Sequence, residues 1–498
     1  MKTTTTIEIL KAAIGNPVTR KVLKGMSKYC EKDGKNRIEV AIELYTGKRE
    51  SACLSCRATE KIVANVLKKG GEAFGLTPEE IKEKFKDPYW RKGLASTVKG
   101  IALFGVKKPF TSGAPYQVVW DVTYACNLRC KHCYATAGKP WADELTTEEA
   151  KQAIDVFDRA GVTIIAFSGG EPLLRPDILD LAKYAHEKGI YVALATNGTL
   201  ITKEKAREMK KAGVEFVQIS LDGATAKTHD EFRGMKGAFN KTVQGIKNCV
   251  NEKFFVEVST VATRYNYREI PDIIELSEEL GANWFMAFNF VPTGRGKDIV
   301  RMDLTPDERE EMLRMLWNEL KTRKNINVLS TAPQFARVAL QQEMNENEKI
   351  VPTHFYNPKL AGKLVNLAEF IGGCGAGRFY LAMRANGDLQ PCVFFPLKIG
   401  NIKEDDFEEL LVSNKVLQEL RDKDLLKGCS TCEYRYYCGG CRARAYGYFG
   451  DYLKPDPGCV KNKEYWEMVI KGDEIEKSKG QCRQKSGGRK AMPKKDGA

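Results

Sequence analysis

The sequence is poor in histidine and contains no long apolar run. It has four histidines in 498 residues, so a histidine-based metal site is not expected. No apolar stretch reaches about 18 residues, roughly what a membrane-spanning helix needs. The N-terminal stretch MKTTTTIEILKAAIG carries Glu8 and lacks the apolar centre of a secretory signal, so we expect a cytoplasmic protein with reduced thiols. P-loops, serine-nucleophile motifs and paired glycosidase carboxylates are not recognisable, which disfavours those enzyme classes.

Positive charge is concentrated at one end of the chain. The formal net charge is +14, and the last twenty residues hold seven Lys or Arg against one Asp. A Gly- and Lys-rich end of this kind is typical of a disordered tail, which we expect over residues 466–498. Peripheral contact with an anionic membrane is the alternative role for this tail, and no nucleic-acid partner is expected.

The alternation of apolar and helical stretches predicts an α/β protein. Six β-rich runs recur at roughly 30-residue intervals, the period of βαβ units; they cover 117–124, 162–170, 190–198, 216–223, 255–263 and 284–292. Six units cannot close an eight-stranded barrel, so we expect a partial (βα)6 TIM-like barrel or a doubly wound sheet. The helix before the second run carries acids in its first turn, and the helix after the third ends at Gly213.

Composition shifts divide the chain into five expected segments. They are a helical N-terminal extension (1–110), the barrel core (111–300), a helical connector (301–369), a small α+β Cys-rich domain (370–465) and the basic tail (466–498). Within the fourth segment, Asn386-Gly387 between two short β-rich runs predicts a hairpin.

Cysteine is the informative residue type, with fifteen copies. Thirteen fall into groups: Cys30, Cys53 and Cys56; Cys126, Cys130 and Cys133; and Cys374, Cys392, Cys429, Cys432, Cys438, Cys441 and Cys459. Only Cys249, expected in a helix core, and Cys482, in the tail, stand alone. In a reducing compartment, grouped cysteines indicate metal sites rather than disulfides.

The second group follows the first β-rich run, at the strand end where α/β proteins build their sites. Cys126-x3-Cys130-x2-Cys133 offers three thiols, and a structural zinc site normally uses four ligands. His132 lies between two of them and is expected to point elsewhere. Three thiolates on a four-iron cluster leave one iron open to a small molecule.

Together with the motifs that follow, this triad resembles the signature of the radical S-adenosylmethionine (SAM) superfamily. The matching features are Tyr134 after the third cysteine, GGEP (169–172), TNG (196–198), SLDG (220–223), HDEFRG with Arg233, and PTGRG (292–296). The resemblance implies that the three cysteines hold a 4Fe–4S cluster and act as the catalytic centre. A ferredoxin- or flavodoxin-type donor would supply an electron for cleavage of SAM, and the 5′-deoxyadenosyl radical would abstract hydrogen from a substrate C–H bond.

The same resemblance implies a SAM pocket. The backbone of Gly169 and Gly170 would receive the SAM amino group, assisted by Glu171, because glycine lets the chain approach closely. Ser220 and Asp222 would contact the ribose or methionine. Asn197 and Arg233 would face the carboxylate, and Tyr134 the adenine.

The C-terminal cysteines resemble the SPASM extension of radical SAM enzymes, with a zinc ribbon as the alternative. This resemblance implies one or two auxiliary 4Fe–4S clusters. Cys429, Cys432, Cys438 and Cys459 would hold one, and Cys374, Cys392 and Cys441 the other. No cysteine precedes Cys374 closely, so the second cluster would keep an open iron or take a ligand from elsewhere.

The residues after Cys392 depart from one part of that family. Val393, Phe394 and Phe395 stand where sulfatase-maturing relatives carry an aspartate base. This disfavours sulfatase maturation and predicts either an apolar surface near the cluster or ordinary core residues.

The N-terminal group pairs Cys30-x2-Asp33 with Cys53-x2-Cys56. Three interpretations stay open: a small site for zinc or iron with Asp33 as fourth ligand, free thiols, or a thiol donated to the auxiliary cluster.

The sequence as a whole predicts an anaerobic radical SAM/SPASM oxidoreductase or maturase, with peptide or protein modification as the leading function. A tetrapyrrole or a lipid chain is the alternative substrate. A non-catalytic iron–sulfur electron-transfer or scaffold protein is the alternative from another class, and a zinc-binding nucleic-acid protein is a third.

Overall fold

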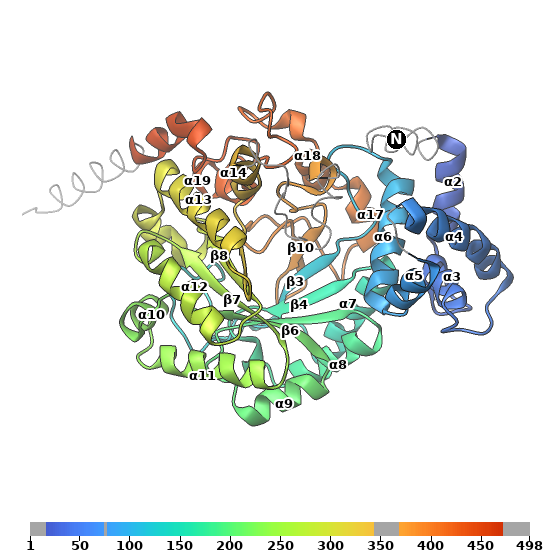
Figure 1. Ribbon diagram of the computed structural model, residues 1–498, viewed down its shortest axis with the longest axis horizontal. Coiled ribbons are helices and arrows are strands. Elements are labelled where there is room, and N and C mark those ends of the chain that lie inside the picture. Colours follow the sequence, from blue (N-terminus) through green and yellow to red (C-terminus); the bar gives the residue numbers. More distant parts are fainter. Residues whose placement is uncertain (1–15, 74–76, 343–367, 472–498) are drawn as a thin grey trace, which may run out of the picture.

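One ten-stranded sheet organises the structure, a computed structural model that describes residues 16–73, 77–342 and 368–471 (Figure 1). Seven parallel strands run through its centre in chain order: β3 (Gln117–Asp121), β4 (Ile164–Ser168), β5 (Tyr191–Thr196), β6 (Val214–Ser220), β7 (Phe255–Ala262), β8 (Trp284–Asn289) and β9 (Asn327–Ser330). Consecutive order means that every crossover steps in the same direction. The sheet is therefore a partial barrel and not the doubly wound alternative.

The helices between these strands cover one face of the sheet (Figure 1). They are α7 (Thr147–Ala160), α8 (Ile178–Glu187), α9 (Lys203–Lys211), α10 (Ala226–Arg233), α11 (Ala238–Asn251), α12 (Ile270–Glu279) and α13 (Pro306–Thr322). α7 starts at a capping box in which Thr146 and Glu149 satisfy each other's backbone N–H groups. Alternate strand residues such as Val118, Ile165 and Val192 pack against these helices in the main core.

The other strand residues line the inner, concave face of the barrel. Val119, Ala166 and Ala193 form a separate apolar cluster there, joined by Phe216 and Val393. Because side chains alternate along a strand, the inner face also receives Asp121, Ser168 and other polar groups at the carboxyl ends. These ends form the open mouth of the barrel.

The C-terminal segment extends the same sheet. β10 (Tyr380–Met383) pairs parallel with β3, and β11 (Asp388–Gln390) and β12 (Gly400–Asn401) follow antiparallel. The hairpin expected at Asn386-Gly387 is confirmed, with Gly387 at φ +89°. The helices of this segment include α17 (Phe407–Ser413), α18 (Lys415–Arg421) and α19 (Arg442–Phe449).

The structure adds strands where the sequence predicted helices or a separate unit. The segment 301–369, expected as a helical connector, contains α13, α14 (Gln334–Gln342) and also β9, which pairs with β8. Tyr380–Met383 joins the barrel sheet itself. The first residues of the expected tail, 466–471, continue a helix that starts at 463, and residues 472–498 with Cys482 lie outside the described residues.

The N-terminal module, described over residues 16–73 and 77–104, consists of helices and their connections, with a two-residue ladder between β1 (Tyr29–Cys30) and β2 (Lys35–Asn36). Its helices are α2 (Pro17–Met26), α3 (Arg37–Tyr45), α4 (Leu54–Ala73), α5 (Pro78–Phe85) and α6 (Pro88–Phe104). α6 packs against the amino ends of the barrel strands: Lys99 Nζ donates to Ala160 O (3.1 Å), and the Tyr89 ring lies 5.4 Å from that of Tyr191. The module thus contacts the barrel near β4 and β5, at the end opposite the mouth.

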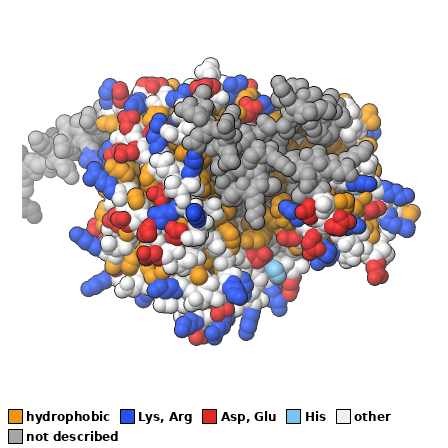
Figure 2. Space-filling view, viewed as in Figure 1, with side chains coloured by type: hydrophobic (Ala, Val, Ile, Leu, Met, Phe, Trp, Pro, Cys, Tyr) orange, Lys and Arg blue, Asp and Glu red, His pale blue; other side chains and the backbone are white. Residues whose placement is uncertain are grey.

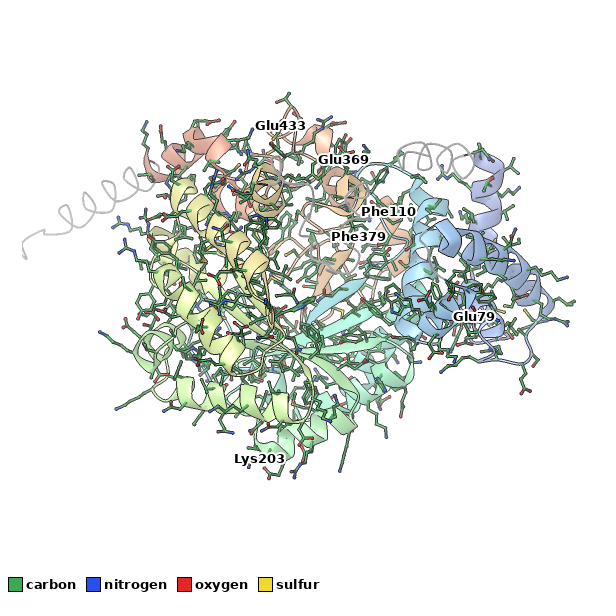
Figure 3. The ribbon with its side chains drawn as sticks, in the orientation of Figure 1. Glu79, Phe110, Lys203, Glu369, Phe379 and Glu433 are labelled. Carbon is green, nitrogen blue, oxygen red and sulfur yellow. The ribbon has the colours of Figure 1, made fainter. Side chains whose placement is uncertain are left out.

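The segment between the module and β3 is held by the C-terminal domain. Phe110 and Phe379 lie close together in Figure 3, with ring centroids 6.1 Å apart. The Phe110 N–H also donates to Phe370 O (2.8 Å).

On the described part of the face in Figure 2, acidic and basic side chains are interspersed. In the described ranges, no helix is both long and apolar enough to span a bilayer.

Candidate active site

The three cysteines of the second group lie on a loop that leaves the carboxyl end of β3. The loop closes on itself because Cys126 N donates to Gly138 O (3.2 Å) and Gly138 N to Tyr124 O (2.8 Å). The three thiols share an apolar surround with Leu128. Leu128 N donates to Cys126 Sγ (3.4 Å), a contact that stabilises thiolate charge.

Arg295, from the PTGRG motif after β8, braces this loop. Its N–H donates to Cys133 O (2.9 Å), Nε to Cys130 O (2.9 Å) and Nη1 to Ala137 O (2.9 Å). The sequence predicted no specific role for this motif. In the structure its role is to hold the loop, because these three hydrogen bonds fix the peptide groups around two of the thiols.

Gly169 and Gly170 allow the loop to approach the end of β4. A Cβ on Gly169 would lie 2.3 Å from Thr123 O, and one on Gly170 would lie 2.1 Å from Ala125 O. Gly170 N donates to Thr123 O (2.7 Å) and Glu171 N to Ala125 O (2.8 Å). The described contacts therefore explain both glycines by backbone packing, and the expected contact with SAM stays a prediction.

Glu171 joins the GGEP and TNG motifs. Its buried carboxylate accepts hydrogen bonds from Thr196 Oγ1 (2.7 Å), Asn197 N (2.9 Å) and Leu173 N (3.2 Å). Burial raises the pKa of Glu171, while these donors oppose the rise. Asn197 in turn donates through Nδ2 to Asn127 Oδ1 (2.8 Å). Asn127 belongs to the cysteine loop, and the sequence predicted no role for it.

A buried ion pair lies against the cysteine triad. Arg233 Nε is 2.6 Å from Asp222 Oδ2, and Arg233 Nη1 is 3.7 Å from Cys130 Sγ. Asp222 is fully buried and also accepts from Val261 N (2.8 Å). Burial opposes its charge, but Arg233 and two histidines outweigh this and lower the pKa of Asp222.

His132 and His229 complete this network. His132 Nε2 lies 3.4 Å from Asp222 Oδ2, and its ring stacks on Phe232 at 4.3 Å. His229 Nδ1 accepts from Asp222 N (3.1 Å). His132 therefore faces the carboxylate of Asp222, a partner that the sequence did not indicate.

Tyr134 and Ser220 border the mouth of the barrel. Tyr134 donates its hydroxyl proton to Asp121 Oδ1 (2.7 Å), and burial raises the pKa of Asp121 to about 6. The Tyr134 ring packs edge-on against Phe394 at 5.1 Å. Ser220 ends β6, half-buried and paired with Ser259 of β7. The contacts expected between these side chains and SAM remain predictions.

Of the phenylalanines after Cys392, Phe394 faces the mouth and Phe395 the core. Phe394 contacts Tyr134 and lies 6.2 Å from Phe288 at the end of β8. Phe395 is fully buried against Tyr446. The prediction of an apolar surface near the cluster therefore fits Phe394, and the prediction of an ordinary core residue fits Phe395.

Four C-terminal thiols surround a cavity of about 370 Å³. They are Cys429, Cys432, Cys438 and Cys459, the set implied by resemblance for one auxiliary cluster. Gly440 N donates to Cys438 Sγ (3.4 Å). A thiol-lined cavity of this kind fits an iron–sulfur cluster.

The remaining three C-terminal thiols, Cys374, Cys392 and Cys441, are near enough to influence one another's charge. Burial raises the pKa of Cys392, and the nearby Cys374 and Cys441 raise it further. Asp456 orients Cys441 by accepting its N–H (2.9 Å), and it is itself paired with the fully buried Arg444 (3.0 Å).

Arg444 joins the C-terminal domain to the barrel. Its guanidinium also pairs with the carboxylate of Asp303, at 2.9 Å, and donates a hydrogen bond to Phe290 O (2.7 Å) just after β8. The C-terminal cysteines are thereby fixed to the barrel mouth.

Comparisons with known proteins match this architecture. A model of the radical SAM superfamily matches residues 120–277, and a model of an iron–sulfur cluster-binding domain, SPASM, matches 374–433. The chain is 40% identical over 354 residues to the AdoMet-dependent heme synthase of Methanosarcina barkeri, which covers 70% of this chain and 97% of that protein. The chain belongs to the radical SAM superfamily. It is an iron–sulfur enzyme with 4Fe–4S clusters and SAM as cofactors, as the sequence predicted.

Two further similarities are informative. Mycofactocin maturase of Mycobacterium tuberculosis is 32% identical over 354 residues, 70% of this chain and 83% of that protein. The structure of Streptococcus suis SuiB bound to S-adenosylmethionine aligns with a TM-score of 0.60 at 18% identity, covering 85% of this chain and 92% of the other. The last likeness confirms the fold of a radical SAM/SPASM enzyme. Neither family model includes any residue before 120.

Proposed function

We propose that this enzyme acts on an iron tetrapyrrole, in a heme-forming or closely related reaction. The observation that carries the proposal is its 40% identity to a heme synthase along 97% of that protein's length. Peptide modification, the leading prediction from the sequence, becomes the second candidate and is supported by the 32% identity to a maturase. We place the enzyme in the reducing cytoplasm with a ferredoxin- or flavodoxin-type donor.

The triad Cys126, Cys130 and Cys133 would hold the SAM-binding cluster. Once reduced, such a cluster cleaves SAM and supplies a 5′-deoxyadenosyl radical for hydrogen abstraction. The chain's own residues prepare this site: Leu128 N and Arg233 lie against two of the thiols and stabilise their negative charge. Asp222 holds the guanidinium in place, which makes it a positioning residue in this proposal.

The substrate side of the mouth is aromatic. Phe394 and Phe288 face each other at 6.2 Å, and Tyr134 packs against Phe394. Val393, which follows Cys392 directly, points to the apolar inner face of the barrel. Aromatic rings suit the flat face of a porphyrin, since stacked or edge-on ring contacts stabilise such ligands.

The auxiliary cluster held by Cys374, Cys392 and Cys441 would lie beside this wall. Its ligand Cys392 is two residues from Phe394, so we propose that this cluster is the one near the substrate. A three-thiol set leaves one iron without a cysteine, which we propose as the open or differently ligated position.

The test uses the full chain, reconstituted anaerobically and reduced with dithionite in the presence of SAM. We expect an iron porphyrin with carboxylate-ended side chains to be converted, with 5′-deoxyadenosine formed in step with product by liquid chromatography and mass spectrometry. Phe394→Ala should raise the KM for the porphyrin at least about tenfold through loss of ring contact. The matched control, Trp90→Ala, removes an aromatic ring that is 41% exposed on α6 and should leave KM unchanged.

Two results separate the candidates. SAM cleavage that proceeds without any change in the porphyrin would refute the tetrapyrrole proposal and leave the peptide candidate. No 5′-deoxyadenosine under strong reductant would contradict catalysis by this chain and favour the electron-transfer or scaffold alternative.

A further inference from the structure

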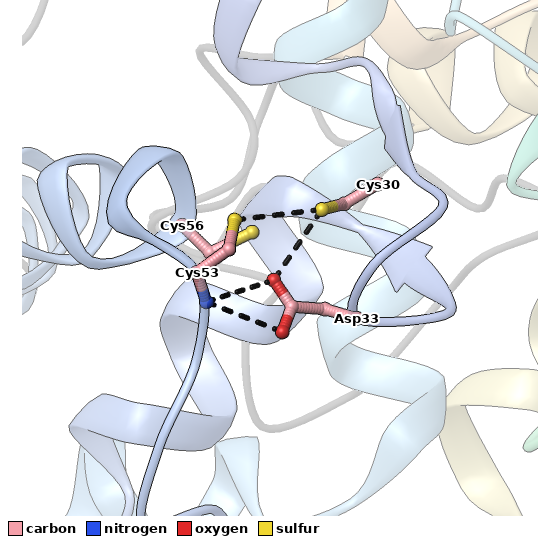
Figure 4. Close-up of side chains that lie close together, drawn as sticks. All are labelled: Cys30, Asp33, Cys53 and Cys56. Carbon is pink, nitrogen blue, oxygen red and sulfur yellow. Dashed lines mark hydrogen bonds between the residues drawn. The ribbon is translucent and has the colours of Figure 1, made fainter.

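Four ligand-type side chains converge in the N-terminal module, which neither family model covers. Cys30 ends β1, Asp33 lies in the following turn, and Cys53 and Cys56 stand at the start of α4 (Figure 4). One ligand atom from each of the four lies within 4.8 Å of all the others. Among the residues that the structure describes, no other group of three or more Cys, His, Asp or Glu side chains converges in this way.

The turn after Cys30 is preformed by its backbone. Asp33 N and Gly34 N both donate to Cys30 O, at 3.2 and 2.8 Å. Gly34 adopts φ +69°, a conformation that glycine reaches without strain. The turn thereby brings Cys30 Sγ to 3.3 Å from Asp33 Oδ2.

The second pair of ligands stands on a helix start. Arg57 N donates to Cys53 O (3.0 Å), so the first turn of α4 sets the spacing of Cys53 and Cys56. Cys53 N lies 3.3 Å from both carboxylate oxygens of Asp33. The carboxylate is therefore oriented by the same helix start that presents the two thiols.

We propose that Cys30, Asp33, Cys53 and Cys56 bind one zinc ion. In a tetrahedral site with Zn–S bonds of about 2.3 Å, two sulfurs lie about 3.8 Å apart. Cys30 Sγ and Cys53 Sγ are separated by 3.6 Å. An iron–sulfur cube would spread its ligands over four corners, and a disulfide would need about 2.0 Å. The observed spacing fits a single ion.

The site is closed and its role is structural. Three thiolates and one carboxylate complete four-coordination, which leaves no position for a substrate or water. Cys56 is fully buried and Cys30 is 6% exposed, whereas Asp33 and Cys53 are half-buried, so zinc would lie at the edge of the module's interior. Arg49 Nη1 is 3.7 Å from Asp33 Oδ1 and offsets part of the negative charge that remains on the zinc-bound site.

The zinc site would fix one of the surfaces by which the module contacts the barrel. Tyr29, adjacent to Cys30, packs its ring under the Arg159 guanidinium at 4.5 Å, and Glu31 pairs with the same arginine at 2.5 Å. Arg159 lies near the end of α7. Loss of zinc should therefore loosen this docking and leave the thiol triad at the mouth intact.

The test measures zinc and iron together in full-length protein purified anaerobically. We expect about one zinc per chain in addition to the cluster iron. Cys53→Ser and Cys56→Ser should lower zinc to below about a tenth of this value without changing iron. Cys249→Ala is the matched control, because Cys249 is a buried thiol on α11 without ligand neighbours, and it should keep its zinc.

X-ray absorption at the zinc edge gives a second readout that does not depend on loss of folding. The wild-type protein should show three sulfurs and one oxygen, and Asp33→Cys should show four sulfurs. Zinc-free wild-type protein, iron at this site, a Cys30–Cys53 disulfide by mass spectrometry, or zinc that survives both serine substitutions would each overturn the proposal.

Discussion

Glu257 is a carboxyl group buried on the inner face of the barrel, and it should make stability depend on pH. Its neighbours Val256 and Val258 pack in the helix-covered core, so Glu257 points to the concave side. It is 3% exposed, and its Oε1 accepts a hydrogen bond from Gln218 Nε2 at 2.5 Å. No cation is among the groups that shift its pKa.

The magnitude follows from the change in pKa. Burial raises the pKa of Glu257 from its ordinary 4.5 to about 7, and the bond from Gln218 opposes the rise only in part. The difference of about 2.5 corresponds to about 3 kcal/mol at 1.36 kcal/mol per unit. Because the folded pKa is the higher one, ionisation destabilises the native state as pH rises from about 4.5 to about 7, and the full cost applies above that range.

Glu257→Gln removes this cost and keeps an amide that can still accept from Gln218. The stability advantage of the variant should grow by about 2 kcal/mol between pH 5.5 and pH 8. Urea unfolding of the anaerobic holoenzyme, followed by tryptophan fluorescence at both pH values, measures it. Glu311→Gln, an exposed substitution on α13, is the control. Its free energy of unfolding should change with pH in the same way as that of the wild type. If the free energy of unfolding of Glu257→Gln also changed with pH in parallel with that of the wild type, Glu257 would not be a neutral carboxyl in the native state.

Three substitutions at the mouth have distinct expected outcomes. Gly170→Ala places a Cβ 2.1 Å from Ala125 O and should lower iron per chain, with a stability loss of at least about 2 kcal/mol; normal iron loading would contradict this. Arg444→Met leaves the buried Asp456 without its ion-pair partner, while Asp303 keeps Arg309, and should cost about 3–5 kcal/mol in urea unfolding. Arg233→Lys cannot contact both its carboxylate partner and Cys130 in the same way, and should slow 5′-deoxyadenosine formation about tenfold at unchanged iron. An unchanged rate of 5′-deoxyadenosine formation would show that Arg233 does not contribute to the reaction.

Much of the barrel could be predicted because its signals are local. Buried parallel strands are continuous apolar runs, and all six expected runs overlap a strand of the sheet. The hairpin at Asn386-Gly387 was predictable for a similar reason, since the turn needs a residue at φ +89° and glycine provides it. The triad and the GGEP, TNG and SLDG motifs also have fixed spacing along the chain.

What the sequence missed depends on contacts between distant segments. β9 has four residues, too few for a periodic signal, and is defined by pairing with β8. β10 joins the barrel through Tyr380 opposite Gln117, and nothing near either residue indicates the other. The contact of Arg233 with Asp222 and Cys130 likewise requires the folded mouth, where burial makes the pairing strong.

The two ends of the barrel therefore have different proposed roles, radical chemistry at the mouth and zinc binding near the opposite end. The strands of the sheet separate the two sites. The glycines that seat the thiol loop follow β4 at Ser168, whereas the N-terminal module contacts Ala160 and Tyr191 at the opposite end of the strands. Five residues at about 3.3 Å each separate the ends by roughly 16 Å. The proposed zinc ion would lie beyond reach of SAM bound at the mouth, so it would act on the mouth only through the sheet. Loss of zinc should accordingly change stability before it changes the chemistry at the cysteine triad.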